Sequence, residues 1–125
     1  MSEFILKSET YRIIGACMEV YRNLGYGFLE VVYKDAMEIE FLHRDMNYIQ
    51  EDEHTIDYKG IILKHKFLAD YTLFERIIVE VKTNKDGITG DAIAQTLNYL
   101  KASGLRLGLI INFGKSALDY KRLIF

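Results

Sequence analysis

The chain has 125 residues, half of them hydrophobic, and a formal net charge of −2. This length fits one domain, residues 1–125, with a sizeable core, and the composition excludes a disordered chain. The small net charge argues against a protein that holds nucleic acid by charge alone, although residues 101–125 carry five Lys or Arg against one acidic residue.

The single cysteine, Cys17, excludes an internal disulfide and fits a reducing compartment. Cys17 lies among apolar residues at helical spacing, so we expect it to be buried. The first seven residues lack the long apolar region of a signal peptide, and no run approaches the ~18–20 apolar residues of a membrane span. We therefore expect a cytoplasmic protein that does not associate with a membrane.

Two helices are expected before any strand. The first has Ser8 as its candidate N-cap and ends near Gly25. Its apolar positions at helical spacing are Ile14, Cys17, Met18 and Tyr21. The second helix covers about residues 28–44. Its apolar stripe contains Leu29, Tyr33, Ala36 and Met37.

The next segments alternate in the manner of strands. Residues 48–58 and 61–71 are separated by a Lys59-Gly60 turn, and residues 72–76 can close a hairpin onto the aliphatic run 77–82. A helix is expected from about residue 90 to 102, followed by strands at 107–113 and 120–125. The strand–helix–strand step between residues 77 and 113 implies a parallel crossover, so we predict an α/β fold with a central mixed sheet flanked by helices on both faces.

Asp70 and Glu80 lie on consecutive strand-like runs, ten positions apart. If the hairpin between them is symmetric about Glu75, the two carboxylates lie opposite each other on one face, with Cβ atoms roughly 4.5–5.5 Å apart. Like charges in this position destabilise a sheet unless another charge compensates them.

A divalent cation with oxygen ligands would supply that charge. Mg²⁺ or Mn²⁺ held by Asp70, Glu80 and the backbone carbonyl of Val81 would keep positions open for water and phosphate. Lys82, on the face of Glu80, could then orient the attacking water in phosphodiester hydrolysis. The structural alternative is that Glu80 and Lys82 neutralise each other at the rim of the sheet while Asp70 caps a turn.

Two further groups are candidates for the same site. Gln95 and Tyr99 are four residues apart on the third helix and share a face, which helical angles place opposite the stripe of Ile93, Leu97 and Leu100. They could hold a phosphate or orient Lys82, or they could be a half-exposed tyrosine beside a polar neighbour. Glu30, in the first turn of the second helix, is either an additional carboxylate facing the metal or the partner of Lys34 in a helical ion pair.

Together these residues resemble the GxxExxY protein family, a branch of the PD-(D/E)XK nuclease superfamily. Gly27, Glu30 and Tyr33 match the naming motif. Asp70 with Glu80-Val81-Lys82 matches the superfamily core, and Gln95 with Tyr99 resembles the QxxxY motif of RecB-type nucleases. The resemblance covers nearly the whole chain from about residue 10, with Ala69 at the place of the superfamily's proline.

The resemblance implies a restriction-endonuclease-like fold. It also implies that Asp70 and Glu80 are metal ligands, that Lys82 is the catalytic lysine and that Glu30 is an auxiliary carboxylate. Gln95 and Tyr99 would support the substrate or the lysine.

We therefore expect a Mg²⁺- or Mn²⁺-dependent nuclease that acts on DNA or RNA. The alternative is a catalytically inactive nucleic-acid or protein interaction module that retains the fold. A homodimer is a further expectation, because so small a domain leaves little surface for gripping a duplex.

Overall fold

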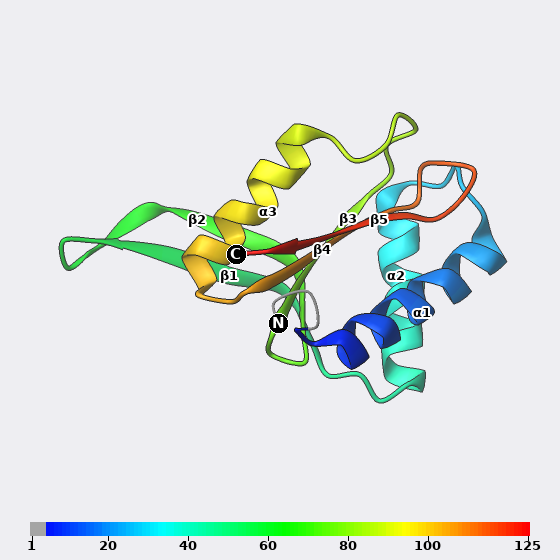
Figure 1. Cartoon of the computed structure of the whole chain (residues 1–125), viewed down its shortest axis with the longest axis horizontal. Coiled ribbons are helices and arrows are strands. Elements are labelled where there is room, and N and C mark those ends of the chain that lie inside the picture. The colour runs from blue at the N-terminus through cyan, green and yellow to red at the C-terminus, as the bar shows by residue number, and fades with distance from the viewer. Residues whose placement is uncertain (1–4) are drawn as a thin grey trace.

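A five-stranded sheet lies between two helical layers in the computed structural model, which describes residues 5–125 (Figure 1). The helices of this part of the chain are α1 (Lys7–Leu24), α2 (Glu30–His43) and α3 (Gly90–Ser103). The strands are β1 (Tyr48–Tyr58), β2 (Ile61–Leu73), β3 (Ile77–Lys82), β4 (Leu107–Asn112) and β5 (Asp119–Ile124). Their order along the chain is the predicted one.

The sheet is mixed, as predicted. Its strands follow one another in sequence order, and every neighbouring pair is antiparallel except β3 and β4, which are parallel and joined through α3. All of β4 and nearly all of β3 are buried, in keeping with their continuous aliphatic sequences. The α/β fold expected from the sequence is confirmed.

Each face of the sheet is covered by helix. Helices α1 and α2 pack on the face that includes Tyr71, Val79 and Ile111. Helix α3 packs on the other face, where Leu100 lies in one cluster with Ile78 and Ile110. None of the helices formed by residues 5–125 is both long enough and apolar enough to cross a membrane.

The first two helices differ in detail from the prediction. Helix α1 begins at Lys7 and has Leu6, in a left-handed conformation, as its N-cap, so the predicted Ser8 cap is wrong. Its buried residues are Thr10, Ile13, Ala16, Cys17 and Val20. Met18, which we placed on the apolar stripe, is 48% exposed. Burial of Cys17 is confirmed, and burial raises the pKa of this thiol to about 12.

Helix α2 begins at Glu30 rather than at residue 28. Leu29 is its N-cap and is 75% exposed, so its predicted place on the apolar stripe is wrong. The side chains that α2 buries are those of Tyr33, Met37 and Phe41, which follow at intervals of four residues.

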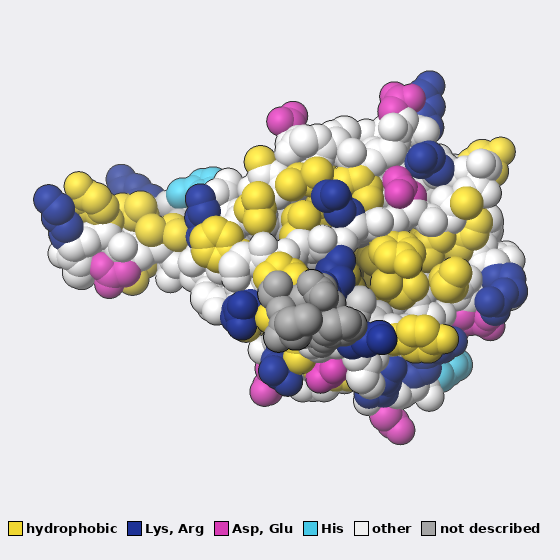
Figure 2. Space-filling view, viewed as in Figure 1, with side chains coloured by type: hydrophobic (Ala, Val, Ile, Leu, Met, Phe, Trp, Pro, Cys, Tyr) yellow, Lys and Arg dark blue, Asp and Glu magenta, His cyan; other side chains and the backbone are white. Residues whose placement is uncertain are grey.

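The outer part of the β1–β2 hairpin projects beyond both helical layers. We call residues 55–66 the arm; its residues 57–66 are all exposed, and Figures 1 and 2 show it extending to the left of the body. Aliphatic and basic side chains lie side by side on it, and Ile61 and Ile62 are 69% and 56% exposed. Lys64, His65 and Lys66 on β2 are exposed as well.

Candidate active site

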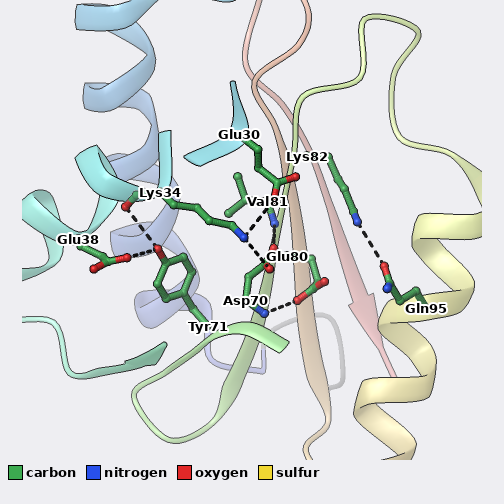
Figure 3. A network of polar contacts seen from close by, with 9 residues as sticks. All are labelled: Glu30, Lys34, Glu38, Asp70, Tyr71, Glu80, Val81, Lys82 and Gln95. Carbon is green, nitrogen blue, oxygen red and sulfur yellow. Dashed lines mark hydrogen bonds and ion pairs between the residues drawn. The ribbon is translucent and has the colours of Figure 1, made fainter. Parts of the chain in front are cut away.

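The centre of the candidate site is the point where β2 separates from β3. The two strands pair at Leu73–Ile77, Thr72–Ile78 and Tyr71–Val79, which is the register predicted for a hairpin symmetric about Glu75. Beyond Tyr71–Val79, hydrogen bonds from backbone N–H groups to side-chain carboxylates replace the backbone–backbone pairing of the two strands. The Asp70 N–H donates to Glu80 Oε2 at 2.7 Å, and the Val81 N–H donates to Asp70 Oδ2 at 2.8 Å. Asp70 and Glu80 therefore meet across the bend (Figure 3).

The prediction that both carboxylates share one face needs a correction. Glu80 alternates with Val79 and Val81 and so belongs to the α3 side, whereas the Asp70 carboxylate contacts Lys34 of α2. The cause is an irregularity in β2, because Ala69 packs in the α3 cluster while Tyr71, two residues on, packs with α1 and α2. Asp70 thus lies between the two faces, where side chains from both helical layers can reach it.

Lys34 connects α2 to this junction. Its Nζ lies 2.9 Å from Asp70 Oδ1 and 3.0 Å from Glu30 Oε2 (Figure 3). Burial lowers the pKa of Lys34, but its hydrogen bonds to Asp70 and Glu30 outweigh burial and raise that pKa above its ordinary value. The helical ion pair of Glu30 with Lys34 is therefore present, and the same lysine also brings Glu30 to the edge of the site.

The sequence showed Lys34 only as a helical partner of Glu30. Its contact with Asp70 joins residues 36 positions apart, and no local pattern could reveal it. The one available signal was spacing, since residue 34 shares a helical face with residue 30.

A second contact fixes α2 against β2. The Tyr71 hydroxyl donates to Glu38 Oε2 at 2.5 Å. Because Glu38 lies one helical turn after Lys34, this hydrogen bond holds the helix in the position from which Lys34 reaches Asp70.

Glu80 is almost fully buried, with 2% of its surface exposed. Burial and the neighbouring Asp70 carboxylate raise the pKa of Glu80 to about 8. Burial, followed by the nearby Glu80 and Asp70 carboxylates, raises the pKa of Tyr99 to about 12. The environment of Glu80 therefore opposes its negative charge.

Lys82 and Gln95 come together on the α3 side. Lys82 Nζ donates to Gln95 Oε1 at 3.2 Å (Figure 3). Both residues line a pocket of about 340 Å³ with Thr89 and Asp91 at the start of α3. The pocket leaves Lys82 open to a ligand arriving from solvent.

Tyr99 does not lie where the helical angles placed it. It is 5% exposed, it belongs to the same buried cluster as Leu100, and its ring meets that of Phe67 edge to face at 5.6 Å. The predicted separation of Tyr99 from the apolar stripe is therefore wrong. Gln95 does lie on the exposed side of α3, where it meets Lys82.

The donors for a metal ion are few. Within residues 5–125, no three His, Cys, Asp or Glu side chains form a group that could hold an ion. The donors predicted from the sequence are the Asp70 and Glu80 carboxylates and the Val81 carbonyl, and the two carboxylates meet at the β2–β3 junction. Hard oxygen donors of this number suit Mg²⁺ or Mn²⁺, which usually keep several waters.

The sheet, its two helical layers and the acidic junction define a restriction-endonuclease-like α/β fold. A model of the PD-(D/E)XK nuclease superfamily matches residues 7–123, and the chain belongs to that superfamily. Membership indicates a nuclease in general terms, and nucleases of this superfamily generally use divalent metal ions.

The chain is also similar to a solved structure, that of SSO0001. The two share 19% sequence identity with a TM-score of 0.59, over 74% of this chain and 48% of that one. This chain thus spans about half the length of SSO0001, and the similarity concerns the fold. No curated protein matches the chain.

Proposed function

We propose that the protein is a Mg²⁺- or Mn²⁺-dependent nuclease that hydrolyses phosphodiester bonds in DNA or RNA. The observation that supports this most directly is the meeting of Asp70 and Glu80 at the β2–β3 junction, in a chain of the PD-(D/E)XK nuclease superfamily.

In this proposal Asp70, Glu80 and the Val81 carbonyl hold the ion. When bound, the ion polarises the phosphate and lowers the pKa of a coordinated water. Lys82, held by Gln95 beside the open pocket, orients the attacking water or stabilises charge on the phosphate. Glu30 is an auxiliary carboxylate, and Tyr99 supports α3 from within its buried cluster.

End-labelled single- and double-stranded DNA and RNA test the proposal with Mg²⁺, Mn²⁺ or EDTA. We expect cleavage only with metal, and a loss of roughly 100-fold or more in Asp70→Ala and Lys82→Ala, because each removes a group that acts on the transition state. Asp35→Ala and Lys121→Ala are matched controls at exposed positions and should cleave like wild type. Undiminished cleavage in both site variants would rule the proposal out.

The alternative, an inactive interaction module, is favoured by one observation. The Lys34 ammonium pairs with both Asp70 and Glu30 and so offsets part of the negative charge that a metal ion would otherwise balance. Calorimetric titration with Mn²⁺ separates the two functions. Absence of binding by folded protein at millimolar Mn²⁺ supports the module, and binding that Asp70→Ala abolishes supports the nuclease.

We further propose that the active form is a homodimer, since one small domain offers little surface for gripping a duplex. Light scattering of a cleaving sample tests this, and a monomeric mass contradicts it.

A further inference from the structure

Lys34 pairs with two carboxylates at the edge of the candidate site. Its side chain is 22% exposed, and that of Asp70, its partner from a different element, is 19% exposed. The two N–O distances, 2.9 Å to Asp70 and 3.0 Å to Glu30, place one ammonium between two carboxylates. In this position it stands where a cation shared by Asp70 and Glu30 would stand.

A hydrogen bond between α2 and β2 fixes the position of Lys34 relative to Asp70. Tyr71 follows Asp70 directly on β2, and its hydrogen bond to Glu38 ties that point of the strand to α2. The backbone of α2 is thus held beside β2, whereas the flexible four-carbon side chain of Lys34 can change its rotamer. Separation of the ion pair thus requires a rotamer change of Lys34 and no rearrangement of the helix.

We propose that Lys34 is a resident counter-ion, which occupies the cation position beside Asp70 in the metal-free protein and is displaced when a divalent ion binds. This inference rests on the proposed metal-dependent function. Asp70 Oδ2 accepts from the Val81 N–H and Asp70 Oδ1 accepts from Lys34, so an ion that binds at Oδ1 competes with Lys34. Two positive charges at that oxygen repel each other, and the ammonium moves out toward solvent. There it can meet the phosphate of an incoming nucleic acid.

Calorimetry with Mn²⁺ tests the competition directly. We expect Lys34→Gln to bind Mn²⁺ about tenfold more tightly than wild type, since it removes the competing charge but keeps a hydrogen-bonding side chain. Lys34→Arg keeps the charge and should bind no more tightly than wild type. Lys66→Gln is the matched control. Lys66 lies on the arm and also forms an ion pair, with Glu53 at 3.6 Å. This variant should leave the affinity for Mn²⁺ unchanged.

Wild-type protein provides a second measurement that does not depend on a variant's folding. Acetic anhydride labelling, mapped by peptide mass, should modify Lys34 slowly without metal and several-fold faster with Mn²⁺. Lys121, exposed on β5, serves as the reference and should not change.

The outcomes distinguish this inference from the proposed function. If wild type binds Mn²⁺ but Lys34→Gln binds it no more tightly and labelling does not change, the counter-ion role is wrong and the nuclease proposal stands. If Lys34→Gln binds Mn²⁺ and wild type does not, Lys34 is the counter-ion and the metal-dependent function of the natural chain is wrong. If neither binds, both are wrong.

Discussion

At the scale of single residues, the buried Glu80 determines the electrostatic character of the site. A carboxylate that is 2% exposed and faces Asp70 is costly to ionise, and its pKa rises accordingly. The metal-free protein therefore holds a proton at Glu80 under conditions in which an ordinary glutamate would have lost it.

This proton predicts a pH dependence of stability without metal. The pKa of Glu80 rises from 4.5 to about 8 on folding, so between these values the folded chain retains a proton that the unfolded chain releases. The contribution of Glu80 to the free energy of unfolding is thus highest below about pH 4.5 and falls as the pH rises to about 8. Urea unfolding in EDTA should show that Glu80→Gln gains stability relative to wild type across this range.

The comparison between the two proteins cancels the titration of groups that do not interact with Glu80. A constant difference between wild type and Glu80→Gln from pH 5 to pH 8 would contradict a raised pKa at this position.

At the scale of elements, the distance between α3 and the sheet depends on Gly108. A Cβ at this position of β4 would lie 2.8 Å from Thr96 Cγ2 on α3, which is closer than side chains pack. The small residue lets the helix approach the sheet, and this approach brings Gln95 within reach of Lys82.

Gly108→Ala should therefore destabilise the protein by about 1–3 kcal/mol, as overpacking does, and should lower cleavage by loosening the Gln95–Lys82 contact. Gly90→Ala is the matched control, because a Cβ there meets no atom within 4 Å. Urea unfolding of both variants is the measurement. Equal stability of the two would show that α3 can shift without cost.

At the scale of the whole molecule, the arm and the body differ in how they are held. Residues 57–66 are exposed and pair only between β1 and β2, whereas β3 and β4 lie within the core. A two-stranded ribbon without further cover has little stability of its own. We expect the arm to open locally far more often than the sheet.

Limited trypsin digestion should consequently cut first at Lys59, Lys64 or Lys66. Mass spectrometry of the early fragments measures the order, and circular dichroism of the nicked protein should remain close to that of the intact protein, because the core residues lie outside the arm. Early cleavage at Arg12 or Arg22 of α1 would contradict this division between arm and body.

Much of the fold could be predicted because its signals are local. The aliphatic runs of β3 and β4, the Lys59-Gly60 turn and the symmetry of the β2–β3 hairpin depend on neighbouring residues, and each led to the observed element. What failed depends on docking: which stripe of α1 faces the sheet, how deeply Tyr99 is buried, and where β2 becomes irregular.

The candidate site divides in the same way. The Asp70–Glu80 register followed from the hairpin, but the reach of Lys34 to Asp70 follows from how α2 packs on the sheet. The metal, the substrate and the reducing compartment predicted from Cys17 stay predictions.

The projection of the arm has an evolutionary consequence. A segment that adds almost nothing to the core can exchange residues, lengthen or shorten while the sheet and the helices that pack on it keep their geometry. Relatives of this chain should accordingly diverge fastest between residues 55 and 66, and a new specificity could arise there without loss of the ancestral fold.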